Sequence, residues 1–143
     1  MALLSILIPT RNRNALVASN VLSICRSQIL LRNCEIIIGD NFSHFPVADT
    51  LEEVIEYPLF ASIQIVRHTH NLGVHGNIFS LIHRAQTPYV LILGDDDFIV
   101  NKTLEDFIAL SSGDQISLPN TIHLFSFLSK NFQNTTYSIN PPP

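Results

Sequence analysis

The sequence predicts an α/β fold, in which a central sheet of mostly parallel strands has helices on both of its faces. Two observations favour this fold class. Short apolar runs alternate with segments of helical periodicity along most of the 143 residues, and a polar cluster follows each of the first four apolar runs. Strands that alternate with helices need crossover connections, which place the strands parallel in one three-layer sheet.

Four short apolar runs are the predicted strands. They are rich in Ile, Leu or Val and too brief for helices, as is typical of strands that are buried on both faces. The predicted strands are residues 4–9 (LSILIP), 34–40 (CEIIIGD), 62–68 (SIQIVRH) and 89–93 (YVLIL), and residues 121–129 (TIHLFSFLS) are a candidate fifth strand.

Helical patterns fill the segments between these strands. Residues 14–30 predict one long helix, for which Asn12 or Asn14 is the candidate N-cap. Asp49 or Thr50 is the candidate cap of the second helix. The helices after the first are predicted at residues 50–57, 77–85 and 103–112.

The composition is that of a folded domain. Apolar residues make up 46% of the chain and charged residues 14%, which indicates a buried core. We expect one domain over residues 1–128 and a poorly ordered tail over residues 129–143, because the chain ends in three prolines. The net charge of −4 and the scattered Lys and Arg residues argue against a nucleic-acid partner.

Cys25 and Cys34 have neither a metal-binding nor a redox spacing. We interpret them as free thiols, which suits a reducing cytoplasm. No apolar run approaches the roughly 20 residues of a membrane span, and the apolar N-terminus lacks the basic segment of a signal peptide. The sequence therefore predicts a cytoplasmic protein and leaves peripheral membrane association open.

A polar cluster directly follows each predicted strand. The carboxyl ends of parallel strands meet at one edge of a sheet, where α/β folds bind their ligands. All four clusters are therefore predicted at the same edge. They are residues 10–13, 40–43, 68–73 and 95–97.

Asp95, Asp96 and Asp97 are the most informative of these residues. Three adjacent carboxylates repel one another, and a hard divalent cation such as Mg²⁺ or Mn²⁺ would neutralise them together with a substrate's phosphates. Arg11 and Arg13, on a neighbouring loop, are candidate partners of phosphate oxygens. The alternative is a solvated acidic turn in which Asp97 caps the next helix.

The other polar residues carry weaker signals. Asp40 could accept hydrogen bonds from a base or ribose, although a turn-forming Asp-Asn pair explains it equally well. Gly73 and Gly76 could let backbone amides approach an anion, or could serve only as a flexible helix entry. His68 and His70 could share one face of an extended segment, but no third zinc ligand is apparent.

Four motifs, in their order and spacing, resemble family 2 glycosyltransferases. They are SILIPTRNR, EIIIGDNFS, HNLGVHGN and YVLILGDDDF, and the resemblance covers roughly residues 3–110. It implies the GT-A fold, a Rossmann-like nucleotide-binding sheet. It also implies transfer of a sugar from a nucleotide diphosphate donor to an acceptor hydroxyl, as in cell wall or polysaccharide biosynthesis.

The resemblance implies a nucleotide-sugar site at matching positions. The segment after the first strand would line the nucleotide pocket, Asp40 would recognise the nucleobase, and the NxG loop would lie beside the nucleotide-sugar. Asp95 would contact the ribose or lie behind the metal. The predicted nucleotide-sugar-binding residues are Pro9, Thr10, Arg11, Asn12, Asp40, Asn71, Gly73, Gly76 and Asp95.

The resemblance also implies Mn²⁺ or Mg²⁺ as cofactor, held in the DXD region. Asp96 is the predicted direct ligand and Asp97 supports it. The family's more common pattern begins with an acidic residue, and Gly94 takes that position here. The expected donor is a UDP-sugar, and the acceptor, whether glycan, lipid or protein, is not indicated.

The general base of such a transferase lies in the second half of its domain, and no residue after position 112 matches it. We therefore interpret the chain as the N-terminal, nucleotide-sugar-binding part of a glycosyltransferase, truncated before its catalytic base. Two alternatives stay open. One is a non-catalytic nucleotide-binding fragment. The other is a phosphohydrolase with Asp95 as nucleophile and Asp97 as acid, although Ile99 stands where such enzymes usually carry Thr or Val.

Overall fold

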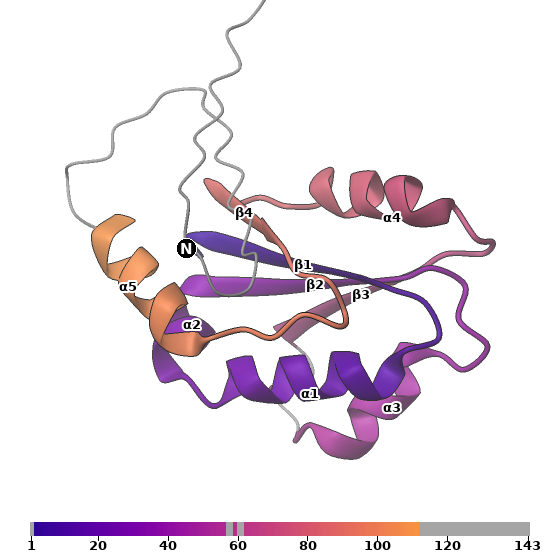
Figure 1. Cartoon of the computed structure of the whole chain (residues 1–143), viewed down its shortest axis with the longest axis horizontal. Coiled ribbons are helices and arrows are strands. Elements are labelled where there is room, and N and C mark those ends of the chain that lie inside the picture. The colour runs from indigo at the N-terminus through magenta and orange to yellow at the C-terminus, as the bar shows by residue number, and fades with distance from the viewer. Residues whose placement is uncertain (1, 57–58, 60–61, 112–143) are drawn as a thin grey trace, which may run out of the picture.

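The computed structural model describes residues 2–56, 59 and 62–111, and within them it forms one parallel sheet covered by helices (Figure 1). The four strands lie in the order β3-β2-β1-β4, and every neighbouring pair is parallel. This order confirms the predicted α/β class. The strands are β1 (Leu4–Thr10), β2 (Cys34–Asp40), β3 (Ile63–Arg67) and β4 (Tyr89–Ile92).

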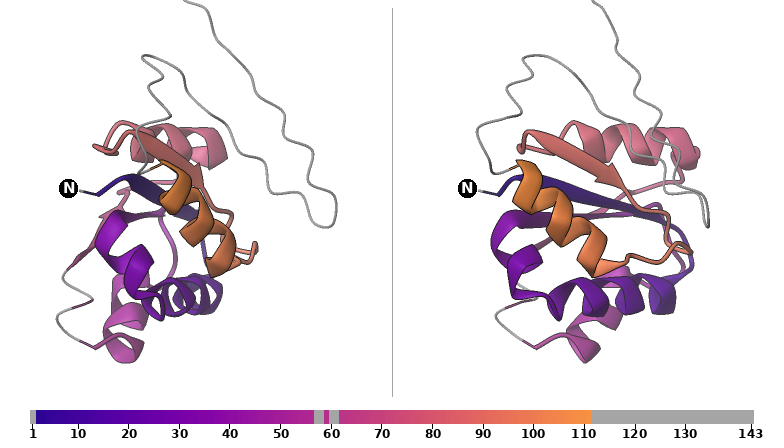
Figure 2. Two further views of the ribbon diagram at one scale, coloured as in Figure 1. Left: turned by 90° about the vertical axis from the view of Figure 1, so that its left-hand side faces the viewer. Right: turned by 60° about the vertical axis from the view of Figure 1, so that its left-hand side comes forward.

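Helices cover both faces of the sheet, so the fold has three layers. In Figures 1 and 2, α4 lies alone on one face of the sheet and the remaining helices lie on the other. These are α1 (Asn14–Cys25), α2 (Gln28–Asn33), α3 (Val47–Val54), α4 (Gly73–Ile82) and α5 (Asn101–Ser111).

Alternate residues of the central strands supply the two halves of the core. Ile6 and Ile8 of β1 pack into the larger half with α1 and α5, whereas Leu7 packs with Ile37 and Leu81 under α4. Because side chains alternate across a strand, a strand buried on both faces must be apolar at consecutive positions. This requirement explains the unbroken apolar runs and fixes the strand ends that carry the site.

The long helix predicted over residues 14–30 is wrong, because the chain forms two helices with a break at Arg26 and Ser27. Ser27 has an extended backbone, and its hydroxyl accepts a hydrogen bond from the Leu30 N–H at 3.2 Å and donates one to Glu105 of α5 at 2.6 Å. A serine in this position caps the second helix.

The predicted helix caps are also wrong. Arg13 is the N-cap of α1 and makes no side-chain capping bond, while Asn14 donates instead to the 45–50 segment. The α3 helix begins at Val47, and its first N–H donates to the Asp40 carboxylate at 3.2 Å. A side chain seven residues upstream therefore caps α3, and neither Asp49 nor Thr50 does.

Two further helices begin earlier than predicted, α4 at Gly73 and α5 at Asn101. Gly73 has a φ of 73°, a left-handed conformation that favours glycine, and this explains the residue type at the helix start. The candidate strand at residues 121–129 and the predicted tail lie outside the described residues. Within the described ranges, no helix has the length and apolar character that crossing a bilayer requires.

Candidate functional site

The aspartates meet the end of β1 at the carboxyl edge of the sheet. Thr10 is the last residue of β1, and its hydroxyl donates to Asp95 Oδ2 at 2.7 Å. Asn20 of α1 donates to the backbone carbonyl of Asp95 at 3.2 Å. Because β1 and β4 are parallel neighbours, these contacts tie the loop after β4 to the loop after β1. The convergence predicted for these two strand ends is confirmed.

Arg13 neutralises the first two aspartates. Its NH1 group donates to Asp95 Oδ1 at 3.0 Å and to Asp96 Oδ2 at 2.9 Å. The hydrogen bonds to these two carboxylates, and then their charges, raise the pKa of Arg13. The repulsion expected among adjacent carboxylates is therefore offset within the protein itself. In the structure, Arg13 holds aspartates in the place of the phosphates predicted for it.

Asp97 closes a tight turn with Gly94. The Gly94 N–H donates to Asp97 Oδ2 at 3.2 Å, and the Asp97 N–H donates to the Gly94 carbonyl at 3.1 Å. A Cβ on Gly94 would lie 2.6 Å from Asp97 Oδ2, so a side chain there would force this carboxylate to move. The acid that the common pattern has at this position would therefore displace the Asp97 carboxylate from this turn. The contact lies within the turn, four residues before α5 begins at Asn101.

Asp40 is buried at the end of β2 and organises the loop that follows. It accepts hydrogen bonds from the Ser43 N–H at 2.9 Å, the Val47 N–H at 3.2 Å and Arg67 NH1 at 2.8 Å. Burial would raise the pKa of Asp40, but the bonds from Ser43 and Val47 and the charge of Arg67 outweigh burial and lower it. Asp40 is therefore a buried carboxylate whose structural contacts hold residues 43–47.

The loops after β1 and β2 are joined by backbone in strained conformations. Asn12 and Phe42 have φ values of 58° and 61°, which are uncommon for residues other than glycine. The Asn12 N–H donates to Ser43 Oγ at 2.9 Å, and Asn12 Oδ1 accepts from the His44 N–H at 2.8 Å. Such strain persists only where the surroundings fix it, and it gathers at functional sites.

The NxG segment, residues 71–73, is hydrogen-bonded to Asn41, which follows the end of β2. Asn41 Nδ2 donates to Asn71 Oδ1 at 2.8 Å, and Asn41 Oδ1 accepts from the Leu72 N–H at 2.8 Å. Asn71 Oδ1 also accepts from the Gly73 N–H at 2.9 Å. Asn71 and Gly73 thus lie in one hydrogen-bonded loop beside β2. Gly76 lies within α4, where a Cβ added to this glycine would meet the Leu72 side chain.

The predicted residues form two groups along the edge. Thr10, Asp95 and Asp96 lie around Arg13, at the ends of β1 and β4. Asp40 and the NxG segment lie at the ends of β2 and β3, and the bond from Asn12 to Ser43 connects the two groups. The four remaining predicted residues lie near the two groups: Pro9 within β1, Arg11 exposed just after it, Asp97 in the turn with Gly94, and Gly76 within α4.

Among the described residues, His68 is paired with an amide and not with a second metal-binding side chain. Its Nε2 lies 3.0 Å from Asn77 Oδ1, and Asn77 Nδ2 donates to the Gly39 carbonyl at 2.8 Å. His70 contacts Thr69. Within the described ranges, no three His, Cys, Asp or Glu side chains are grouped so that they could hold a metal ion.

Three buried amides hold parts of the edge: Asn41 was expected there within the 40–43 cluster but was not predicted as a site residue, and Asn20 and Asn77 were missed altogether. Asn20, Asn41 and Asn77 each hold backbone or side-chain groups of the edge, as described above. For Asn20 a signal was available, because it shares its helical face with the apolar residues Val17 and Ile24. A polar side chain on a buried face needs a hydrogen-bond partner. For Asn20 that partner is the Asp95 carbonyl, in the loop of residues 95–97, here called the aspartate loop.

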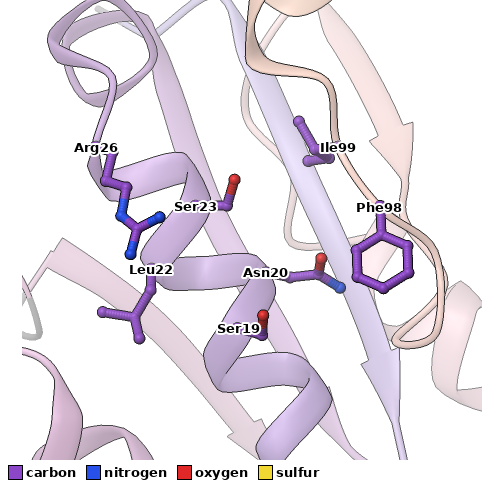
Figure 3. A pocket seen from close by; sticks show the side chains of 7 residues that line it. All are labelled: Ser19, Asn20, Leu22, Ser23, Arg26, Phe98 and Ile99. Carbon is purple, nitrogen blue, oxygen red and sulfur yellow. The ribbon is translucent and has the colours of Figure 1, made fainter.

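A cavity of about 220 Å³ opens behind the aspartate loop, between α1 and the segment that leads to α5 (Figure 3). Asn20 lies at its border, so this side chain both lines the cavity and holds Asp95. The Asp95–Asp97 carboxylates do not line it, so the cavity is distinct from the aspartate cluster. Its lining residues are Ser19, Asn20, Leu22, Ser23, Arg26, Phe98 and Ile99.

The aspartate loop fits a divalent cation that is shared with a ligand. The Asp96 side chain is 65% exposed, and one Asp97 oxygen is engaged in the turn with Gly94. Two carboxylates are too few to enclose an ion, but Mg²⁺ and Mn²⁺ commonly take one or two carboxylates together with substrate phosphates and water. The donor set is thus suitable for a cation that arrives with a diphosphate.

The sequence matches the family described as glycosyl transferase family 2 over residues 5–137. The chain belongs to this family. The match confirms the resemblance and extends beyond the residues 3–110 on which it was based. No curated protein matches the chain.

Solved glycosyltransferase structures share the fold of this family 2 member. S. aureus TarS (residues 1–349) in complex with UDP-GlcNAc is 17% identical, with a TM-score of 0.67 over 83% of this chain and 37% of that one. The mannosyltransferase PcManGT from Pyrobaculum calidifontis, in complex with GDP-Man and Mn²⁺, is 16% identical, with a TM-score of 0.66 over 79% and 33%. S. aureus TarS 1–349 in another structure is 22% identical, with a TM-score of 0.61 over 75% and 31%.

These similarities confirm the GT-A-like fold of the chain. The chain spans about a third of the length of the chain in each of these three structures, from 31% to 37%.

Proposed function

We propose that this family 2 glycosyltransferase chain binds a nucleotide diphosphate sugar, with a UDP-sugar as the expected donor, at the carboxyl edge of β1 and β4. The observation that carries the proposal is the cluster in which Thr10, Arg13 and Asn20 hold the Asp95–Asp97 loop. The reaction it would support is transfer of the sugar to an acceptor hydroxyl.

The residues of the cluster would have distinct roles. Thr10 and Asn20 fix Asp95, so that the loop keeps one shape before the ligand arrives. Asp96, which projects into solvent, and Asp97 would hold Mn²⁺ or Mg²⁺. When bound, such a cation would neutralise the charge that develops on the departing diphosphate. Arg11 and Arg13 would supply guanidinium donors for phosphate oxygens.

The second group would hold the nucleoside. In this proposal the loops after β1 and β2, stapled by Asn12, form one wall, and the NxG segment with Asn71 and Gly73 forms the other. Asp40 already holds three donors, so we propose that it contributes to base recognition mainly by shaping residues 43–47. The proposal assigns no general base for the acceptor hydroxyl among the described residues.

The compared proteins support a nucleotide-sugar donor in general terms. TarS is in complex with UDP-GlcNAc or with UDP, and PcManGT with GDP-Man and Mn²⁺. Because these proteins differ in their nucleotide, the base and sugar of this chain need a direct measurement.

A phosphohydrolase is the weaker alternative. An aspartate nucleophile must present an accessible oxygen to phosphorus, whereas the Asp95 side chain is only 11% exposed and each of its oxygens already accepts a hydrogen bond, from Thr10 or from Arg13. A non-catalytic nucleotide-binding module would share the same site, and only a transfer assay with an acceptor separates it from a transferase.

Isothermal titration calorimetry tests the donor site. The full chain is titrated with UDP and with GDP, once with Mn²⁺ and once with EDTA. We expect UDP to bind about tenfold more tightly or better with Mn²⁺, since carboxylates and diphosphate share the cation. In the Asp96→Ala variant this metal dependence is expected to disappear.

Asp106→Ala is the matched control, because it removes an exposed carboxylate from α5 that, among the residues the structure describes, pairs only with Lys102. It should leave UDP binding unchanged. Absence of nucleotide binding with both Mn²⁺ and EDTA would refute the donor site, and equal binding of GDP and UDP would refute the UDP preference alone.

A further inference from the structure

Arg13 contacts two carboxylates at the proposed cation site. One belongs to Asp96, which the proposed function assigns to the cation, and the other to its neighbour Asp95. We propose that Arg13 is an exchangeable counter-ion. In the free chain its guanidinium neutralises Asp95 and Asp96; when a divalent cation and a diphosphate bind, it releases Asp96 to the cation and pairs with phosphate oxygens. This inference rests on the proposed function and concerns the coupling between its two ligands.

The hydrogen bonding of Arg13 leaves it able to take a second partner. Both of its ion pairs use one nitrogen, NH1, which donates to Asp95 at 3.0 Å and to Asp96 at 2.9 Å. A guanidinium carries five N–H donors. Half of the side chain surface, 50%, is exposed. Donors other than those on NH1 can therefore reach a phosphate while Arg13 still holds Asp95.

The two aspartates differ in what holds them. The Asp95 side chain is 11% exposed, and Thr10 and Arg13 each bind one of its oxygens. Asp96 is far more exposed, and among the described residues its carboxylate contacts only Arg13. Thr10, and Asn20 through the Asp95 carbonyl, keep Asp95 in place when Arg13 moves, so the exchange takes place at Asp96.

This arrangement couples the two ligands. A cation that arrives alone must displace the guanidinium of Arg13 from Asp96. The guanidinium then has no second anion to replace Asp96. A cation that arrives with a diphosphate brings the anion that Arg13 needs, so that each ligand favours binding of the other. The structure thus predicts that Arg13 weakens the binding of the cation alone and strengthens the binding of the nucleotide.

Opposite changes in two affinities test the exchange. Binding of Mn²⁺ alone is measured from the loss of the free-ion electron paramagnetic resonance signal, and binding of UDP with saturating Mn²⁺ by calorimetry. In Arg13→Gln, Mn²⁺ alone should bind roughly threefold to fivefold more tightly, because the ion pair with Asp96 no longer competes. UDP should bind roughly tenfold more weakly, because a charged hydrogen-bond donor is lost.

Two further variants make the test specific. Arg84→Gln removes the same charge from a guanidinium that, within the described part of the chain, is hydrogen-bonded only to Ser80, and it should change neither affinity. Arg13→Lys keeps a cation beside the buried Asp95 and so protects folding, which circular dichroism checks. It should shift both affinities in the same directions as Arg13→Gln, but less.

Opposite shifts in the Arg13 variants, absent from Arg84→Gln, would support the exchange. Unchanged or weaker Mn²⁺ binding in Arg13→Gln, or an equal gain in Arg84→Gln, would overturn it, as would undetectable Mn²⁺ binding in both the wild type and Arg13→Gln. If Arg13→Gln tightens Mn²⁺ binding but no variant binds UDP, the release of Asp96 stands and the proposed nucleotide site fails.

Discussion

Replacing Asp40 by Asn should destabilise the fold strongly, and in a pH-dependent way. Asp40 is buried, and its carboxylate accepts two backbone N–H groups and pairs with Arg67, whose side chain is 37% exposed. An asparagine has one acceptor oxygen in place of two, so it cannot serve the Ser43 side and the Val47 and Arg67 side together.

The expected loss follows from these contacts. The partly solvated ion pair with Arg67 contributes up to about 1 kcal/mol. The two charge-assisted backbone bonds lose about 1 kcal/mol each when the acceptor becomes neutral, or more where an N–H is left without a partner. The sum is about 2–4 kcal/mol, a large fraction of the 5–15 kcal/mol typical of a domain.

The pH dependence has a definite sign. The pKa of Asp40 is lowered in the folded chain, so its stabilisation is complete above the unfolded value, about 4, and is lost as the pH falls through the lower folded value. The penalty of Asp40→Asn should therefore be largest near pH 7 and should shrink below about pH 4.

Urea denaturation followed by circular dichroism measures this penalty. At pH 7 the midpoint of Asp40→Asn should fall by about 1–2 M, from a typical dependence of 1–3 kcal/mol per molar urea. Asp106→Asn, at the exposed pair on α5, should lose less than about 0.5 kcal/mol. A penalty at pH 7 no larger than that of Asp106→Asn, or one that is equally large at pH 3, would refute this reasoning.

Two other substitutions test the packing behind the edge. In Gly39→Ala the added Cβ would lie 2.2 Å from Asn77 Oδ1, so the Asn77 side chain must move away and the free energy of unfolding should fall by about 2–4 kcal/mol in urea denaturation. Adding Asn77→Ala to Gly39→Ala should restore part of this loss. Additive penalties of the two substitutions would contradict the clash. Asn20→Ala should cost about 1–2 kcal/mol and weaken Mn²⁺-dependent UDP binding several-fold by freeing the Asp95 carbonyl, whereas Ser19→Ala, in the same cavity wall, should do neither; equal UDP affinity in the two variants would show that Asn20 does not position the loop.

The strands could be predicted from sequence because their signal is local. A run such as CEIIIGD needs no knowledge of its neighbours to be recognised as buried, and β2 spans the residues expected. The edge convergence followed from the parallel arrangement alone. The GT-A-like fold then followed from the four motifs at the strand ends.

The helix boundaries could not be predicted because tertiary contacts set them. Asp40, at the end of β2, accepts the first N–H of α3. Ser27 separates α1 from α2, and its hydroxyl donates to Glu105 of α5. Both contacts depend on elements that only the folded sheet brings together. A local search for caps near each helix start therefore chose the wrong residues.

The charged contacts of the site were equally hidden from the sequence. The spacing showed that Arg13 and the aspartates share an edge, but it could not show which anion Arg13 holds in the free chain. The structure shows that Arg13 pairs with Asp95 and Asp96. This pairing is the basis of the proposed exchange, in which Arg13 leaves Asp96 for a phosphate.

The most direct measurement of the donor site is the affinity of the chain for UDP with Mn²⁺ compared with EDTA, in the wild type and in Asp96→Ala. We expect Mn²⁺ to tighten binding about tenfold or more in the wild type and to have no effect in Asp96→Ala. Equal UDP affinity with Mn²⁺ and EDTA in the wild type, or an undiminished Mn²⁺ effect in Asp96→Ala, would contradict a cation held by the aspartate loop.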